Sequence, residues 1–302
     1  MKKTGKNHAS TIRVCLILPL LCAVCAACDK NSGLLTANYP VNDAYTDLEV
    51  HDAFEVVVCD TVTEAIVTVR ENEHKNVIVK VENGTLKIGF ESGLFNWFHG
   101  STNKVLLPRN AQLCDVELHG ASSFRGDLQG EEVELDISGA SDFYGNILAT
   151  EVSIDLSGSS DFEGNVDADN IDFEISGSSR ASSSGSCSGQ MDMSISGSSK
   201  LNAYGLQCRA VTGTVSGSSK AYISCCENLT VSVSGSSDLY YRIPSGCSPV
   251  VNCSTTAAPA YMPNNPIIQL GLTPYKKTAT IVAAVFFCIE WYLSLRHPVR
   301  GV

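Results

Sequence analysis

The chain has 302 residues, and its 32 acidic residues against 21 lysines and arginines give a formal net charge of -11. Residues 1–27 carry four basic and no acidic residues, so their removal would change this charge from -11 to -15. Nucleic acid is therefore not an expected partner, because phosphate binding needs a concentrated basic surface.

The N-terminus has the pattern of an export signal. Basic residues up to Arg13 precede an apolar run, residues 14–27, that ends before Cys28. This pattern resembles a bacterial lipoprotein signal peptide, which implies that Cys28 is lipidated and becomes the mature N-terminus. Such signals usually carry Leu at the place of Cys25, so ordinary cleavage after Ala27 is the alternative. We expect an exported protein, anchored by lipid at the outer membrane or cell surface, with the periplasm as alternative.

The polar residues 28–44 suit a tether between a membrane and a folded domain. From about residue 45 to 115 the sequence is β-rich but lacks a 19-residue period, and Asn83-Gly84 predicts a hairpin turn. We expect this segment to cap the N-terminal end of the repeats, because an open solenoid end needs a cover. The predicted strands are Phe54–Val58, Ala65–Val69, Val77–Val81, Leu86–Ile88 and Val105–Leu107.

An aromatic loop interrupts this segment at residues 93–100, where Phe95, Trp97 and Phe98 lie close together. If the loop is exposed, its rings predict a ligand platform, because aromatic faces stack on sugars and other apolar groups. If it is buried, the same rings belong to the core of the cap.

Residues 119–237 are organised by a recurring Ser-Gly phrase, in steps of 19, 19, 19, 20, 20 and 18 residues. Apolar residues alternate with polar ones before each phrase, which is typical of strands with one buried face. A short unit of this kind cannot bury its own apolar face, so successive units must stack. The sequence predicts an all-β, parallel β-helix-like solenoid with coils of about 19 residues. The phrases begin at His119, Ser138, Ser157, Ser176, Ser196, Ser216 and Ser234.

Stacking of the coils predicts a line of charged residues, one following each phrase. Like charges meet at Asp142 and Asp161, which marks a candidate ligand or ion site. The alternative is a solvated face that fixes the register of the coils, since exposed ion pairs contribute roughly 0–1 kcal/mol. The predicted line is Ser123, Asp142, Asp161, Arg180, Lys200, Lys220 and Asp238.

Four cysteines recur 10 to 13 residues after the start of a phrase, and export permits disulfides. We expect either a buried cysteine ladder or one or two disulfides between coils. Only Cys225 and Cys226 lie close together in sequence and no His is near them, so no metal site is predicted. The four cysteines are Cys187, Cys208, Cys226 and Cys247.

Taken together, the export signal, the Phe54-Glu-Val-Val-Val strand, Asn83-Gly-Thr-Leu-Lys-Ile, Val105-Leu-Leu-Pro108 and the Ser-Gly repeats resemble a known family. The family is the "putative auto-transporter adhesin, head GIN domain" family of Bacteroidetes, and the resemblance covers residues 45–253. It implies a right-handed β-helix-like fold in an exported or surface protein. The family offers no established catalytic residues that could be carried over.

The C-terminal residues 254–302 depart from this pattern. An eighth phrase would fall at Cys253, but Gly is absent there and the prolines that follow predict the end of strand pairing. Residues 278–295 are apolar and just long enough to span a bilayer, yet Glu290 disfavours a span. We expect an amphipathic or disordered extension instead.

No constellation typical of catalysis is present: the histidines are scattered, and the repeats carry no nucleophile elbow, phosphate loop or dinucleotide fingerprint. We therefore expect a non-enzymatic envelope or surface lipoprotein without cofactors, an adhesin-like module that binds a glycan or protein. A structural, self-associating envelope protein is the alternative. A third hypothesis, a carbohydrate-active β-helix enzyme, would require paired carboxylates in a groove.

Overall fold

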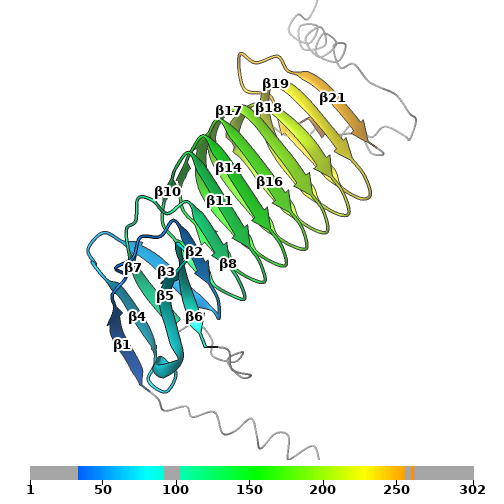
Figure 1. The fold of residues 1–302 in the computed structure, drawn as a ribbon. Coiled ribbons are helices and arrows are strands. Elements are labelled where there is room, and N and C mark those ends of the chain that lie inside the picture. The colour runs from blue at the N-terminus through cyan, green and yellow to red at the C-terminus, as the bar shows by residue number, and fades with distance from the viewer. Residues whose placement is uncertain (1–32, 92–102, 256–259, 262–302) are drawn as a thin grey trace, which may run out of the picture.

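The computed structural model describes residues 33–91, 103–255 and 260–261. These residues form strands throughout, apart from a single 3-10 turn at His74–Asn76. The strands join into one continuous sheet that winds into a column, with β1 at one end and β21 at the other (Figure 1). The predicted all-β solenoid with coils of about 19 residues is confirmed.

Each coil supplies one strand before the Ser-Gly bend and another after it, and equivalent strands pair in parallel. Ile137 pairs with Leu156, for example, and Leu156 pairs with Ile175 in the next coil. The strands before the bend are β8 (Asp115–Leu118), β11 (Glu132–Ile137), β14 (Glu151–Leu156) and β16 (Asn170–Ile175). Those after it are β9 (Ser123–Arg125), β12 (Asp142–Tyr144) and β15 (Asp161–Ala168), with short strands β10 (Leu128–Gln129) and β13 (Ile147–Leu148) beyond them.

In the later coils the strand after one bend continues without a break into the strand before the next. These long strands are β17 (Arg180–Ile195), β18 (Lys200–Val215) and β19 (Lys220–Val233), followed by β20 (Asp238–Arg242). Their pairing is parallel, with irregularities in register between Ala203 and Gln207 on β18.

The core runs along the axis of the column and repeats with the coils. Phe124, Phe143 and Phe162 are buried and stack on one another, with ring centroids 5.3 and 5.5 Å apart. The fourth residue of each phrase is a buried Ser that closes the bend: the Ser160 hydroxyl donates to the Ser157 carbonyl (2.8 Å). The Ser122 hydroxyl makes the same bond to the His119 carbonyl, so this local hydrogen bond closes more than one of the bends.

Glycine is required at the second position of the phrase for two reasons. Gly158 has a φ of +77°, and a Cβ placed there would lie 2.4 Å from the carbonyl oxygen of Gly139 in the preceding coil. Only a residue without a side chain permits both this backbone angle and this close stacking of coils.

The N-terminal strands do more than cap the column. The sheet order places β2 (Asp47–Val50) between β6 (Thr85–Phe90) and β8, all parallel, and β3 (Phe54–Cys59) between β7 (Asn103–Pro108) and β9. Strands β6 and β7 therefore form one additional coil, and β2 and β3 form another, and the repeat spacing revealed neither. In the coil of β2 and β3, His51 stacks on His119 with ring centroids 4.7 Å apart.

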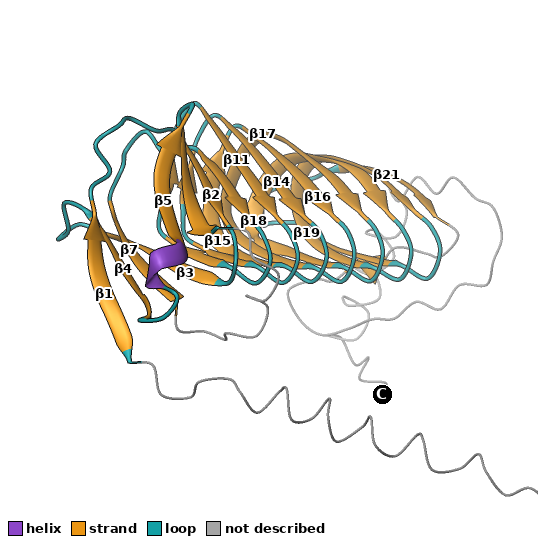
Figure 2. Ribbon diagram, turned by 60° about the horizontal axis from the view of Figure 1, so that its bottom comes forward, coloured by secondary structure: helices purple, strands orange, loops and turns teal. Residues whose placement is uncertain are grey.

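The remaining N-terminal strands cover the end, as predicted. Strand β4 (Ala65–Arg70) pairs antiparallel with β7, β1 (Leu34–Tyr39) pairs antiparallel with β4, and β5 (Val77–Glu82) forms a hairpin with β6. The predicted turn between β5 and β6 is confirmed, with positive φ at Asn83 and Gly84. Figure 2 shows β1 as the outermost strand at this end.

Pairing continues for one more coil at the C-terminal end, so the prediction that it ends at the prolines was wrong. Strand β21 (Val250–Thr255) pairs with β19, and β22 (Ala260–Tyr261) pairs with β20. Val251 and Cys253 pack against the core, which stabilises β21 without a Ser-Gly bend. The predictions for residues 1–27, Cys28 and residues 278–295 lie outside the described residues. Within the part of the chain that the structure describes, no helix has the length and hydrophobicity to cross a membrane.

The cysteines follow both predicted patterns, with one correction. Cys226 and Cys247 form a disulfide across two coils, with Cα atoms 4.9 Å apart. The buried ladder runs from Cys187 through Cys208 to Cys225, not to Cys226. The reason is strand alternation, since Cys225 is buried whereas Cys226 is half-buried.

Candidate ligand-binding face

The strands that follow the bends present a flat outer surface, which we call the binding face. The predicted line of charges is confirmed as its first column, because each member pairs in register with its neighbour. A second column lies two residues further along each strand, and the sequence analysis missed it. The first column is Ser123, Asp142, Asp161, Arg180, Lys200, Lys220 and Asp238, and the second is Arg125, Tyr144, Glu163, Ser182, Asn202, Tyr222 and Tyr240.

The first column changes sign along the face. Asp142 and Asp161 are direct neighbours, and the pKa of Asp142 is raised by burial and by the Asp161 charge. Asp161 forms a salt bridge with Arg180 (3.3 Å), and Lys220 forms one with Asp238 (3.4 Å). All four side chains are well exposed, so these pairs stabilise the fold little and remain accessible to a ligand.

Three tyrosines gather at the C-terminal end of this face, and we call them the tyrosine ladder: Tyr204, Tyr222 and Tyr240. The rings of Tyr222 and Tyr240 are stacked, with centroids 4.8 Å apart and planes 12° apart. Tyr204 meets Tyr222 edge-on, with centroids 5.4 Å apart. All three side chains are half-buried, so each retains exposed ring surface.

Cations surround the tyrosine ladder. The Lys200 ammonium lies 5.3 Å from the centroid of the Tyr222 ring, and the Arg242 guanidinium lies 5.8 Å from that of Tyr204. Arg242 also donates a hydrogen bond to the backbone carbonyl of Tyr204. Burial raises the pKa of Tyr204 to about 12, so its hydroxyl stays protonated and can donate a hydrogen bond.

The opposite end of the face has a single tyrosine. Arg125 lies 4.0 Å from the centroid of the Tyr144 ring, in a cation–π contact, and 3.8 Å from the Glu55 carboxylate. Tyr144 stacks on no other tyrosine among the described residues and pairs with Glu163 in the next coil. The two ends therefore differ in both aromatic surface and charge.

The strands that precede the bends form a second surface, the acidic face. Its outward carboxylates stand next to one another in successive coils. Burial and the neighbouring Glu134 raise the pKa of Asp115 to about 6, and burial and Glu174 do the same for Asp155. Among the described residues no group of three or more His, Cys, Asp or Glu side chains is arranged to hold a metal ion. The acidic face comprises Asp115, Glu117, Glu134, Asp136, Asp155, Asp172, Glu174 and Asp192.

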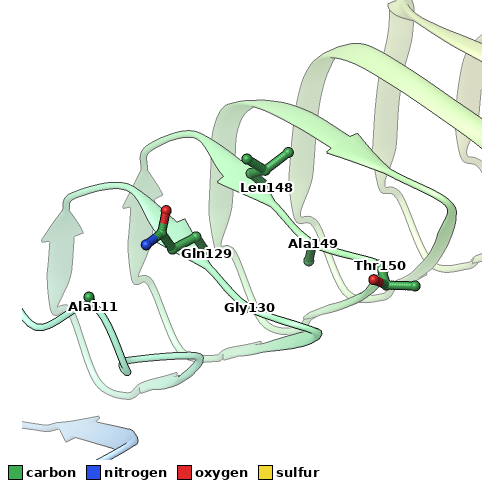
Figure 3. Close-up of a pocket in the computed structure, with 6 residues that line it drawn as sticks. All are labelled: Ala111, Gln129, Gly130, Leu148, Ala149 and Thr150. Atoms are coloured by element: carbon green, nitrogen blue, oxygen red, sulfur yellow. The ribbon is translucent and has the colours of Figure 1, made fainter.

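A shallow hollow lies at the turn between the two surfaces, near β10 and β13 (Figure 3). None of its lining side chains can ionise, so the hollow offers no acid or base for catalysis. The lining residues are Ala111, Gln129, Gly130, Leu148, Ala149 and Thr150. The other sequence-predicted site residues, Cys28, Phe95, Trp97 and Phe98, lie outside the described residues.

Comparison with known structures shows the same fold in three proteins from Parabacteroides species. A putative adhesin from Parabacteroides distasonis matches with a TM-score of 0.67 and 21% identity, covering 77% of this chain and 98% of that one. A putative lipid binding protein from the same species matches with a TM-score of 0.65, 19% identity and coverage of 78% and 98%. A putative adhesin from Parabacteroides merdae matches with a TM-score of 0.66, 18% identity and coverage of 78% and 98%.

No curated protein matches the chain. A family model described as "Putative auto-transporter adhesin, head GIN domain" matches residues 44–242, which contain the added N-terminal coils, all seven Ser-Gly bends and the tyrosine ladder. The chain therefore belongs to the putative auto-transporter adhesin, head GIN domain family.

Proposed function

We propose that this protein is a non-enzymatic lipoprotein of the cell envelope that binds a glycan or protein ligand through its binding face. The observation that carries this proposal is the pair of columns on that face, one charged and one partly aromatic, whose members are half-buried or exposed and lie side by side on parallel strands. Parallel coils repeat each position every ~4.8 Å, so an extended ligand can make the same contact several times.

The proposed lipid anchor fits this arrangement. Cys28 lies six residues before β1, which is at one end of the column, whereas the tyrosine ladder lies toward the other end (Figure 1). Roughly 40 Å separates the two ends at ~4.8 Å per coil. Anchoring at Cys28 would therefore present the tyrosine ladder on the side away from the membrane, at the outer membrane or cell surface.

The test of binding is an array of glycans and matrix proteins probed with the full-length protein. Wild-type protein is expected to bind at least one ligand class, and Asp142→Asn/Asp161→Asn to change that binding through the first column. Trp97→Ala tests whether the aromatic residues Phe95, Trp97 and Phe98 contribute to the same site. Absence of binding to every arrayed ligand would contradict the proposal.

The anchor is tested separately by metabolic labelling with a fatty-acid analogue. Wild-type protein is expected to incorporate the label and to fractionate with membranes, and Cys28→Ala to lose both properties. Label retained in Cys28→Ala would place the acylation elsewhere and contradict the proposed anchor.

A second candidate function, a self-associating envelope protein, is favoured by strand β1. Among the described residues β1 pairs only with β4, and it carries no charge or proline that would protect its outer edge. Leu34 and Leu35 are 60% and 39% exposed. Tyr240 and Tyr241 at the other end of the column do not offer such an edge, because β22 pairs there. Analytical ultracentrifugation distinguishes the two functions: a concentration-dependent dimer abolished by Leu35→Lys would support self-association.

A further inference from the structure

Polar atoms without partners converge beside the tyrosine ladder. Ser224 is fully buried, pairs in register with Arg242, and lies on the same side of β19 as Tyr222 by strand alternation. Its hydroxyl, the Tyr204 hydroxyl and Nε of Arg242 are all buried and have no hydrogen-bond partner among the described residues. We call these three residues the polar notch.

A ligand that displaced the half-buried Tyr204 side chain could complete the hydrogen bonding of the polar notch. Buried polar groups are normally paired, and unpaired ones in a native structure call for an explanation. The Arg242 guanidinium already spans two coils to reach the Tyr204 carbonyl, so it is held in place. Its Nε–H and the two hydroxyls could donate to the oxygens of a bound ligand.

The surroundings of the polar notch define the chemistry of that ligand. Tyr222 and Tyr240 cover one face of each other, so the pair offers a sugar its remaining ring surface and its hydroxyl groups, and Lys200 and Lys220 add positive charge along the adjacent column. A ligand that uses all of these groups has sugar rings, hydroxyl groups and negative charge.

We infer that the tyrosine ladder, the polar notch and Lys200 and Lys220 form a binding site for an acidic polysaccharide, with sugar rings on Tyr222 and Tyr240 and carboxylates toward the cations. This inference rests on the proposed binding function and names its ligand class. The negative net charge of the protein does not oppose it, because the carboxylates of the acidic face lie on the other strands of each coil. On the binding face, Asp142, Asp161 and Glu163 lie toward the opposite end, and Asp238 is paired with Lys220. Charges separated by more than a Debye length of about 8 Å are largely screened at physiological salt.

The experiment measures binding of polygalacturonate to the full-length protein purified in detergent. Neutral dextran controls for sugar rings without charge, and poly-L-glutamate controls for charge without sugar rings. We expect polygalacturonate to bind at least tenfold more tightly than either control, and its affinity to fall as salt is raised.

The variants locate the site. Tyr222→Ala/Tyr240→Ala is expected to weaken polygalacturonate binding at least tenfold, while Tyr222→Phe/Tyr240→Phe, which keeps the stacked rings, retains it. Tyr144→Ala is the matched control, because this tyrosine is half-buried in the same column at the opposite end. Thermal unfolding of each variant shows whether it is folded, and the phenylalanine pair keeps the test valid if the alanine pair unfolds.

Three results would overturn the inference: no binding of polygalacturonate, equal binding of poly-L-glutamate, or equal losses in Tyr144→Ala and Tyr222→Ala/Tyr240→Ala. Binding to neutral glycans or proteins on the array, without binding to polygalacturonate, would leave the proposed function standing and reject the acidic polysaccharide. Failure on the array and with polygalacturonate would reject both.

Discussion

The acidic face and the binding face are built by the same coils, yet their outward residues differ in kind. On the acidic face carboxylates adjoin carboxylates, as Asp136 adjoins Asp155, and burial with mutual repulsion raises the pKa of several. On the binding face the charged column contains both acidic and basic residues, and tyrosines stack at one end. Inward positions are fixed by the core in both faces, so the difference shows that outward positions can vary while the fold is kept.

The largest loss of stability is expected from a substitution in the stacked bends, which both faces share. Gly158→Ala would place a Cβ against the Gly139 carbonyl at a positive φ, and we expect a loss of about 3–5 kcal/mol in the free energy of unfolding. Gly84→Ala is the matched control, because Gly84 also has a positive φ but nothing lies within 4 Å of its Cβ position. We expect about 1–2 kcal/mol there by chemical denaturation, and equal losses would reject the role of coil stacking.

The disulfide joins the two faces at the C-terminal end of the column, because Cys226 lies between the two halves of β19 and Cys247 lies between β20 and β21. Cys226→Ser/Cys247→Ser is expected to lower the free energy of unfolding by about 3 kcal/mol. Thermal unfolding with and without reductant provides the check. Reductant should destabilise wild-type protein by a similar amount and leave the double variant unchanged, and a shift in the double variant would point to other cysteines.

The acidic face should dominate the pH dependence of stability. The folded-state pKa of Asp115 and Asp155 is about 6, above the unfolded value of 3.8, so the folded state binds more protons between these values. Stability is therefore expected to increase as the pH falls from 7 to 5. The lowered pKa values of Glu49, Asp60 and Glu82 oppose this only below about pH 4, where their stabilisation is lost.

Thermal unfolding at several pH values measures this effect. Asp115→Asn/Asp155→Asn should flatten the rise in stability between pH 7 and 5, because it removes the two carboxylates with the largest upward pKa shifts. The Asp161→Asn variant of the binding face should leave the rise in place. A wild-type stability that falls on acidification from pH 7 to 5 would contradict the account.

The smallest change in stability is expected from a substitution in the charged first column of the binding face. Arg180→Gln breaks the exposed salt bridge with Asp161 and should change the free energy of unfolding by less than about 1 kcal/mol. Denaturant titration suffices to measure it. A loss of several kcal/mol would mean that the column holds the fold together and is not available for a ligand.

The repeat spacing alone predicted the coils, the charged column and the need for Gly at the bend, because stacking in register converts sequence period into spatial adjacency. It missed the two N-terminal coils because there the chain leaves the column between β3 and β6, and His51-Asp52-Ala53 replaces the Ser-Gly phrase. The tyrosine ladder was missed because only Tyr222 and Tyr240 occupy equivalent positions of successive coils. Tyr204 lies in the irregular part of β18 and contacts Tyr222 although it is not its register partner.

The central claim is that ligand binding belongs to the binding face and not to the acidic face. The most direct test compares polygalacturonate affinity in two double variants of the full-length protein, each of which neutralises two charges: Lys200→Gln/Lys220→Gln on the binding face and Asp155→Asn/Glu174→Gln on the acidic face. We predict at least a tenfold loss for the first pair and less than a twofold change for the second. Equal effects of the two pairs, or a loss confined to the acidic pair, would contradict the account.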